Sequence, residues 1–333
     1  MAAFQHGRCT SERSSASPPP PPRAPYSWGV RILITGPSGA VGEALVRALG
    51  DQHELRGLSR EPARVAADLP LELMRGDALS GEGLERALDG IEVGYYLIHS
   101  MEPSTEASFE RRDRLAARRF AAAAAHAGVR RIVYLGGLAP SAGRDSVHLR
   151  SRGEVERILL AAVPDSVALR ASLVIGARSR SFRAIVRLIE RLPMIPLPPW
   201  RNHRTQPIDE RDAVAYLAAA ATTQGVGGGA FDIAGPDVLS YGTMIERIAG
   251  LLLLARPVLR LPLAPRFFTS ALAARVSGQP NELLGPLMHS LGGDLLADDA
   301  PARVAFGVPL HSFDAAVEHA LREWEELDRR ARR

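Results

Sequence analysis

The stretch that decides the fold is residues 30–42, Val30-Arg31-Ile32-Leu33-Ile34-Thr35-Gly36-Pro37-Ser38-Gly39-Ala40-Val41-Gly42. The apolar, β-branched run before the first glycine predicts a buried strand, and residues 41–49 predict a helix. Between them the glycines are spaced as G-x-x-G-x-x-G. Gly36 permits a tight exit from the strand, Gly39 lets a pyrophosphate approach the backbone, and Gly42 lets helix and strand pack closely. We therefore expect the phosphates of a dinucleotide at the N-terminus of this helix.

The alternation of strand and helix continues after this turn. We expect strands at residues 53–59, 71–75, 93–99, 131–135, 166–175 and 230–234, and helices at 84–88, 148–161 and from a cap at Ser104 or Thr105 to residue 126. Strands separated by helices imply crossover connections and a parallel sheet with helices on both faces. The sequence therefore predicts an α/β fold, a doubly wound parallel sheet of the NAD(P)-binding Rossmann type.

The rest of the chain differs in amino-acid composition. Residues 1–28 are rich in proline and serine and predict a disordered tail, while residues 329–333 form a basic tail. We assign residues 29–176 and about 206–236 to the dinucleotide-binding domain. Residues 177–205 and 237–328 are interrupted by prolines, and we expect them to form a smaller, mostly helical C-terminal cap that binds the substrate.

The composition excludes several classes of protein. The chain of 333 residues has a single cysteine, Cys9, which excludes a disulfide framework and a cysteine-ligated metal site. No residue is a lysine, which excludes a phosphate-loop NTPase and Schiff-base chemistry. No histidine pair has metal-binding spacing, so we expect no metal.

The charge and hydropathy of the chain also limit its partners. The formal net charge of +4 comes from the two tails, so the part between them lacks the basic surface that nucleic acids require. No apolar run reaches the roughly 18 residues of a membrane-spanning helix, and residues 1–28 contain no apolar leader. We expect a cytoplasmic protein without a transmembrane segment.

The residues after the second strand indicate which dinucleotide binds. Ser59 and Arg60 stand where an acidic residue would hold the ribose of NAD, and both can bind a 2′-phosphate instead. This favours NADP(H) over NAD(H), although Glu61 would favour NAD if the register shifted by one residue. Asp77, followed by Ala78, can accept a hydrogen bond from adenine or, alternatively, cap a helix.

These motifs and several others along the chain occur together in one known family. The chain resembles the atypical short-chain dehydrogenase/reductases of the NmrA-like, NAD(P)H-binding group over about residues 30–325. The resemblance rests on Thr35–Gly42 of the turn, Gly76-Asp77, Tyr95-Tyr96-Leu97-Ile98-His99-Ser100-Met101, Arg131-Ile132-Val133-Tyr134-Leu135-Gly136-Gly137-Leu138, Leu169-Arg170-Ala171-Ser172, Gln206-Pro207-Ile208 with Asp212, and Phe231-Asp232-Ile233-Ala234-Gly235-Pro236.

The resemblance implies a position for each part of the cofactor. The glycine-rich turn would hold the pyrophosphate, through Thr35, Gly36, Ser38, Gly39, Ala40, Val41 and Gly42. Residues after the fourth strand, Leu97, Ile98 and His99, would pass beside the ribose and nicotinamide. Gly136 and Gly137 would border the reactive ring, and Ala171 and Ser172 would touch its carboxamide.

One departure from the group affects the chemistry. Active members of the superfamily use a Tyr-x-x-x-Lys pair, and a chain without lysine cannot have it. At the corresponding place stand His148 and Arg152, which share a helix face. Arg152 would hold the ribose and His148 or His99 would donate a proton. Alternatively, His148 only begins the helix, Arg152 is solvated, and His99 is a packed residue at a strand end.

The sequence leaves two functions open. The first is a reductase that binds NADP(H) and a small-molecule carbonyl or quinone-like substrate. The second is a non-catalytic NADP(H)-sensing protein, regulatory or structural, that acts through a protein partner. A homodimer is compatible with both.

Overall fold

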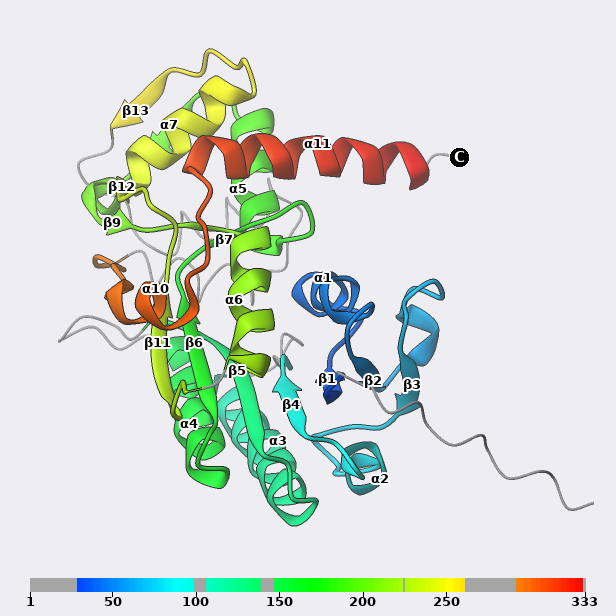
Figure 1. Cartoon of the computed structure of the whole chain (residues 1–333). Coiled ribbons are helices and arrows are strands. Elements are labelled where there is room, and N and C mark those ends of the chain that lie inside the picture. Colours follow the sequence, from blue (N-terminus) through cyan, green and yellow to red (C-terminus); the bar gives the residue numbers. More distant parts are fainter. Residues whose placement is uncertain (1–28, 99–105, 139–146, 224, 261–291, 332–333) are drawn as a thin grey trace, which may run out of the picture.

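The computed structural model describes residues 29–98, 106–138, 147–223, 225–260 and 292–331 (Figure 1). Its centre is a seven-stranded sheet in the order β11-β6-β5-β4-β1-β2-β3, and every neighbouring pair is parallel. The strands are β1 (Arg31–Thr35), β2 (Glu54–Ser59), β3 (Glu72–Arg75), β4 (Val93–Tyr96), β5 (Arg131–Gly137), β6 (Val167–Ala171) and β11 (Gly229–Ile233). This order reverses between β1 and β4, which confirms the predicted doubly wound sheet.

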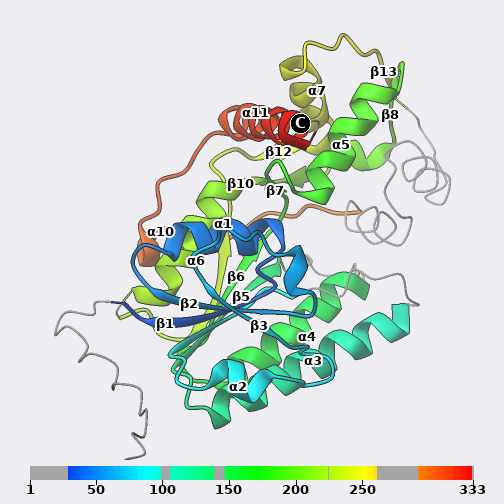
Figure 2. The ribbon, with the colours of Figure 1, turned by 90° about the vertical axis from the view of Figure 1, so that its right-hand side faces the viewer.

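Helices cover both faces of the sheet, as Figure 2 shows. One face packs on α1 (Ala40–Leu49) and α6 (Glu210–Thr222), and the other on α2 (Leu84–Leu88), α3 (Glu106–His126) and α4 (Val147–Ala162). The strands are apolar on both faces because each face is covered. On β1, Ile32 and Ile34 enter the first core and Leu33 the second, all fully buried. We call the sheet with these helices the sheet lobe.

The predicted sixth strand, residues 166–175, is wrong as a single element. β6 ends at Ala171, and the chain then forms β7 (Val174–Ile175), which leaves the main sheet and pairs with β10 (Ile208–Asp209). The bend lies at Ser172, whose hydroxyl donates a hydrogen bond of 2.6 Å to the carbonyl of Gln206. The fourth strand is also shorter than the expected 93–99, because β4 ends at Tyr96.

The cap lies above the carboxyl edge of the sheet (Figure 1). We use this name for α5 (Arg180–Arg191), α7 (Tyr241–Leu251) and α11 (Phe313–Ala331), with the short strands β8 (Ile195–Leu197), β9 (Arg204–Thr205), β12 (Leu239–Ser240) and β13 (Val258–Arg260). Its core joins all three helices through Phe182, Met244 and Val317. The expected mostly helical cap therefore also contains strand pairs, β8 with β13 and β9 with β12.

One helix of the C-terminal part packs on the sheet lobe. α10 (Ala300–Phe306) contacts β11 and α6. Its Phe306 ring stands edge-on to Phe231, 5.2 Å away, and to Tyr216, 6.0 Å away. The chain thus passes repeatedly between lobe and cap, and the assignment of residues to two domains stays a prediction.

Candidate functional site

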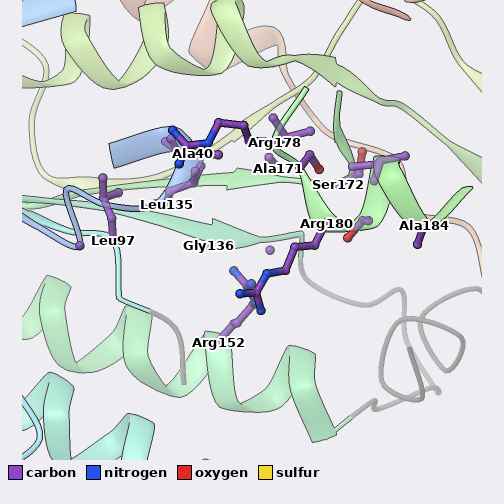
Figure 3. Close-up of a pocket in the computed structure, with 18 of the residues that line it drawn as sticks. Ala40, Leu97, Leu135, Gly136, Arg152, Ala171, Ser172, Arg178, Arg180 and Ala184 are labelled. Carbon is purple, nitrogen blue, oxygen red and sulfur yellow. The ribbon is translucent and has the colours of Figure 1, made fainter. Parts of the chain in front are cut away.

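A cavity of about 1160 Å³ lies between the carboxyl edge of the sheet and the cap (Figure 3). The turn after β1, the ends of β2 to β6, and residues of α5 and α7 line it. Ligand pockets usually measure about 300–1,000 Å³. The cavity therefore lies just above the usual range, and it extends from the glycine-rich turn to the cap.

The glycine-rich turn forms one wall of this cavity. Gly36 has a φ of +71°, which favours glycine, and its carbonyl accepts a hydrogen bond of 3.1 Å from the Gly39 N–H. A Cβ atom at Gly42 would overlap the Gly36 carbonyl oxygen, so a side chain there would push α1 away from the turn. The cradle therefore fits a pyrophosphate, which needs bare backbone at the start of a helix.

Thr35 differs from the other residues expected in the turn, because its side chain is fully buried below the cavity. Its hydroxyl donates to the Tyr95 carbonyl at 2.9 Å and accepts from the Leu97 N–H at 3.0 Å. Thr35 ties β1 to the end of β4 and does not line the cavity. The other six predicted residues of the turn line it: Gly36, Ser38, Gly39, Ala40, Val41 and Gly42.

Residues at and after the ends of β2 and β3 line the far end of the cavity. Ser59, Arg60, Asp77 and Ala78 all lie there, together with Glu61. Glu61 forms an ion pair of 2.7 Å with Arg64, and its N–H donates to the Ser59 hydroxyl at 3.2 Å. One oxygen of Asp77 accepts from the Leu79 N–H at 2.8 Å, so this carboxylate also shapes its own turn.

The middle of the cavity contains the other predicted cofactor residues. Leu97, Ile98, Gly136, Gly137, Ala171 and Ser172 all line it. They come from the ends of three neighbouring strands, β4, β5 and β6, which a parallel sheet brings to one edge. His99 lies outside the described residues, and so does the side chain of His148, whose backbone lies in the first turn of α4.

Arg152 enters the same part of the cavity from α4. Its aliphatic stem lies against Gly137, where an added Cβ atom would be 3.2 Å from the Arg152 Cδ. Its guanidinium lies near Tyr134 of β5. Burial raises the pKa of Tyr134 to about 12, with the Arg152 charge acting in the opposite direction. Tyr134 therefore stays protonated at neutral pH.

Two arginines of the cap side were missed by the sequence reasoning. Arg178 and Arg180 flank the start of α5 and line the cavity. Arg178 pairs with Glu43 of α1, which connects the cap side to the sheet lobe. The signal that could have found them is the run Arg178-Ser179-Arg180-Ser181 directly after a strand end, where α/β proteins bind ligands.

A cluster of carboxylates lies where lobe and cap meet. Glu210 begins α6 and lies against Gly176, which leaves no room for a side chain at that glycine. Burial raises the pKa of Glu210 to about 7, Glu323 of α11 adds to this, and Arg178 opposes it. Glu210 therefore exchanges a proton near neutral pH at the boundary between the two parts.

Two absences hold for the described part of the chain. No group of three histidine, cysteine or acidic side chains there could hold a metal ion. Within the same residues, no helix has the length and apolar character needed to cross a bilayer.

Comparison with known proteins agrees with this geometry. Residues 36–164 match the NAD(P)H-binding family. The chain is 29% identical over 221 residues to the (4-alkanoyl-5-oxo-2,5-dihydrofuran-3-yl)methyl phosphate reductase of Streptomyces griseus, covering 63% of this chain and 69% of that protein. It is 30% identical over 199 residues to the ceramide reductase of Caulobacter vibrioides, with coverages of 59% and 62%. A 24% identical relative is the mitochondrial NADH dehydrogenase (ubiquinone) 1 alpha subcomplex subunit 9 of Arabidopsis thaliana, with coverages of 66% and 57%.

Solved structures share the fold over nearly the whole chain. MoeE5 in complex with UDP-glucose and NAD superposes with a TM-score of 0.67 at 20% identity, covering 90% of this chain and 99% of that one. UDP-glucuronic acid 4-epimerase from Bacillus cereus in complex with NAD gives a TM-score of 0.70 at 16% identity, with coverages of 90% and 99%. At these identities the likeness shows a common Rossmann-type fold.

Proposed function

We propose that this chain, whose residues 36–164 match the NAD(P)H-binding family and which resembles the atypical short-chain dehydrogenase/reductases, is an NADP(H)-dependent reductase of a carbonyl or quinone-like substrate. The observation that carries the proposal is the single cavity shared by the glycine-rich turn and the cap. A protein that only bound a dinucleotide would not need the second half of that cavity.

The preference for NADP(H) rests on the end of β2. Arg60 lines the cavity there beside the buried Ser59. The acidic alternative, Glu61, is already ion-paired with Arg64, which reduces its value as a partner for ribose hydroxyls. A guanidinium and a hydroxyl together suit a 2′-phosphate.

The residues of the chain would orient the reactants and move the proton. When bound, a nicotinamide coenzyme supplies a hydride. Reduction of a carbonyl to an alcohol also requires a proton on the carbonyl oxygen, which a side chain of this protein would supply. Gly136 and Gly137 leave room for the ring, and Arg152 holds the ribose from α4. His148 or His99 donates the proton, because histidine is the side chain suited to this near neutral pH.

The binding half of the proposal is tested by calorimetric titration with NADPH, NADP⁺, NADH and NAD⁺. We expect tighter binding of both phosphorylated forms. The variant Arg60→Ala should weaken NADPH binding about 10- to 100-fold, because a charge-assisted contact is worth about 1.5–3 kcal/mol, and should leave NADH binding unchanged. The control is Arg75→Ala, an exposed arginine at the end of β3 outside the cavity. Equal loss of NADPH and NADH affinity would refute the role of Arg60.

The catalytic half is tested by turnover. NADPH oxidation is followed spectroscopically with a panel of ketones, aldehydes and quinones. Oxidation that depends on the added carbonyl supports a reductase. Tight NADPH binding without turnover of any carbonyl would refute catalysis and favour a nucleotide sensor.

A further inference from the structure

The lining of the cavity is strongly positive. Six arginines line it, namely Arg60, Arg64, Arg112, Arg152, Arg178 and Arg180, against two carboxylates, Glu61 and Asp77. Both carboxylates lie at the ends of β2 and β3, far along the sheet from α5. No described acidic residue lines the cavity on the cap side. The portion of the cavity over β5 and β6 therefore suits a negatively charged ligand.

Among these six arginines, Arg180 is the one for which the described residues offer no partner. It is the first residue of α5, it is exposed, and within the described part of the chain its guanidinium has no hydrogen bond or ion pair. Figure 3 shows Arg180 and Arg152 extending toward one another in the space beside Gly136. Two cations that face the same space repel each other, and an anion between them would relieve this.

The neighbouring wall of the cavity is apolar. α5 presents Ile185 and Leu188 to it, Leu192 follows directly after α5, and Pro198, Met244 and Ile245 complete the surface. Most of these side chains are partly exposed. Such a wall accepts a hydrocarbon chain, and each buried methylene contributes about 0.8 kcal/mol.

We propose that the substrate is an amphiphilic anion, whose phosphate or carboxylate binds Arg180 and whose apolar chain lies between α5 and α7. This deepens the proposed function and rests on it. The anion is not a phosphate of the dinucleotide, because the glycine-rich turn and Arg60 hold those phosphates elsewhere along the edge. The reacting carbonyl would then lie over Gly136 and Gly137, between the charged group and the chain.

The probes are octyl phosphate, octanoate, octanol, butyrate and inorganic phosphate, titrated calorimetrically into the protein with and without saturating NADP⁺. We expect octyl phosphate or octanoate to bind about 10- to 100-fold tighter than octanol, and octanoate about tenfold or more tighter than butyrate. The stronger of the two octyl anions identifies the charged group. Affinity for the anions should fall with rising salt, because Arg180 is exposed.

The variant Arg180→Gln should remove the preference for the octyl anions over octanol. Arg191→Gln, at an exposed position of the same helix outside the cavity, should leave it intact. Equal binding of octanol and the octyl anions, or an unchanged preference in Arg180→Gln, would overturn the inference. Absence of NADP⁺ binding would instead overturn the proposed function, and the titrations without NADP⁺ still decide on the anion.

Discussion

The two ends of the cavity are built in different ways. On the sheet lobe the wall contains six glycines, in the glycine-rich turn and at strand ends such as Gly136 and Gly137. On the cap the wall is side chains, from α5 and α7. At the glycines of the first end the path of the chain determines what fits, whereas at the second end the side chains do. Substitutions at those glycines should therefore act through sterics, and substitutions on the cap through charge and apolar surface.

The largest expected effect is at the glycine-rich end of the cavity, on the sheet lobe. Gly42→Val places a side chain against the Gly36 carbonyl and forces α1 away from the turn. We expect NADPH affinity to fall by more than about 100-fold and the free energy of unfolding to fall by about 1–3 kcal/mol, as for overpacking elsewhere. Titration calorimetry and urea denaturation measure the two effects.

A matched glycine in the cap serves as the control. An added Cβ at Gly250 of α7 meets no atom within 4 Å. Gly250→Ala should therefore raise the free energy of unfolding by about 0.5–1 kcal/mol and leave NADPH affinity unchanged. Full NADPH binding by Gly42→Val would show that the backbone cradle is not used.

An intermediate effect on the free energy of unfolding is expected at Glu210, where the sheet lobe meets the cap. Because the folded protein holds the proton of Glu210 up to about pH 7 and the unfolded chain loses it near 4.5, folding costs more as pH rises through this window. Glu210→Gln removes that cost. The variant should be more stable than the parent by about 1–3 kcal/mol at pH 8 and close to it at pH 4. Denaturant titrations across this range test the difference, and a constant gain at every pH would contradict it.

The smallest effect is expected within the cap alone. The Arg183 guanidinium lies 4.3 Å from the centre of the Trp324 ring, which joins α5 to α11. Arg183→Ala should lower the free energy of unfolding by about 0.5–1 kcal/mol. NADPH affinity should not change, because Arg183 does not line the cavity. A loss of dinucleotide affinity in this variant would show that the cap also contributes to dinucleotide binding, which contradicts the distinction between the two ends of the cavity.

The glycine-rich turn and the strand ends around it could be predicted from the sequence because their signals are local. Glycine spacing, a preceding apolar run and strand ends are contiguous patterns, and the doubly wound parallel sheet is confirmed. The same local reasoning could not show that Thr35 bonds two strands instead of lining the cavity, since its partners lie 60 residues and more away. Arg60 as the NADP-selecting residue stays a prediction.

The cap end could not be predicted because its parts are distant in sequence. Its wall combines residues of α5 and α7, and which arginine points inward depends on how these helices dock. The bend at Ser172, which ends β6 early, depends on a hydrogen bond to Gln206, 34 residues later. The proton-donating roles of His148 and His99 stay predictions.

The order in which the cap is assembled has a consequence for synthesis. Its core needs Phe313, Ala316, Val317 and Ala320 of α11, which the ribosome makes after every other element of that core. The strands and helices that carry the glycine-rich turn emerge much earlier. During synthesis the apolar faces of α5 and α7 therefore stay uncovered until α11 has been made, and in that interval they are open to contacts with other chains.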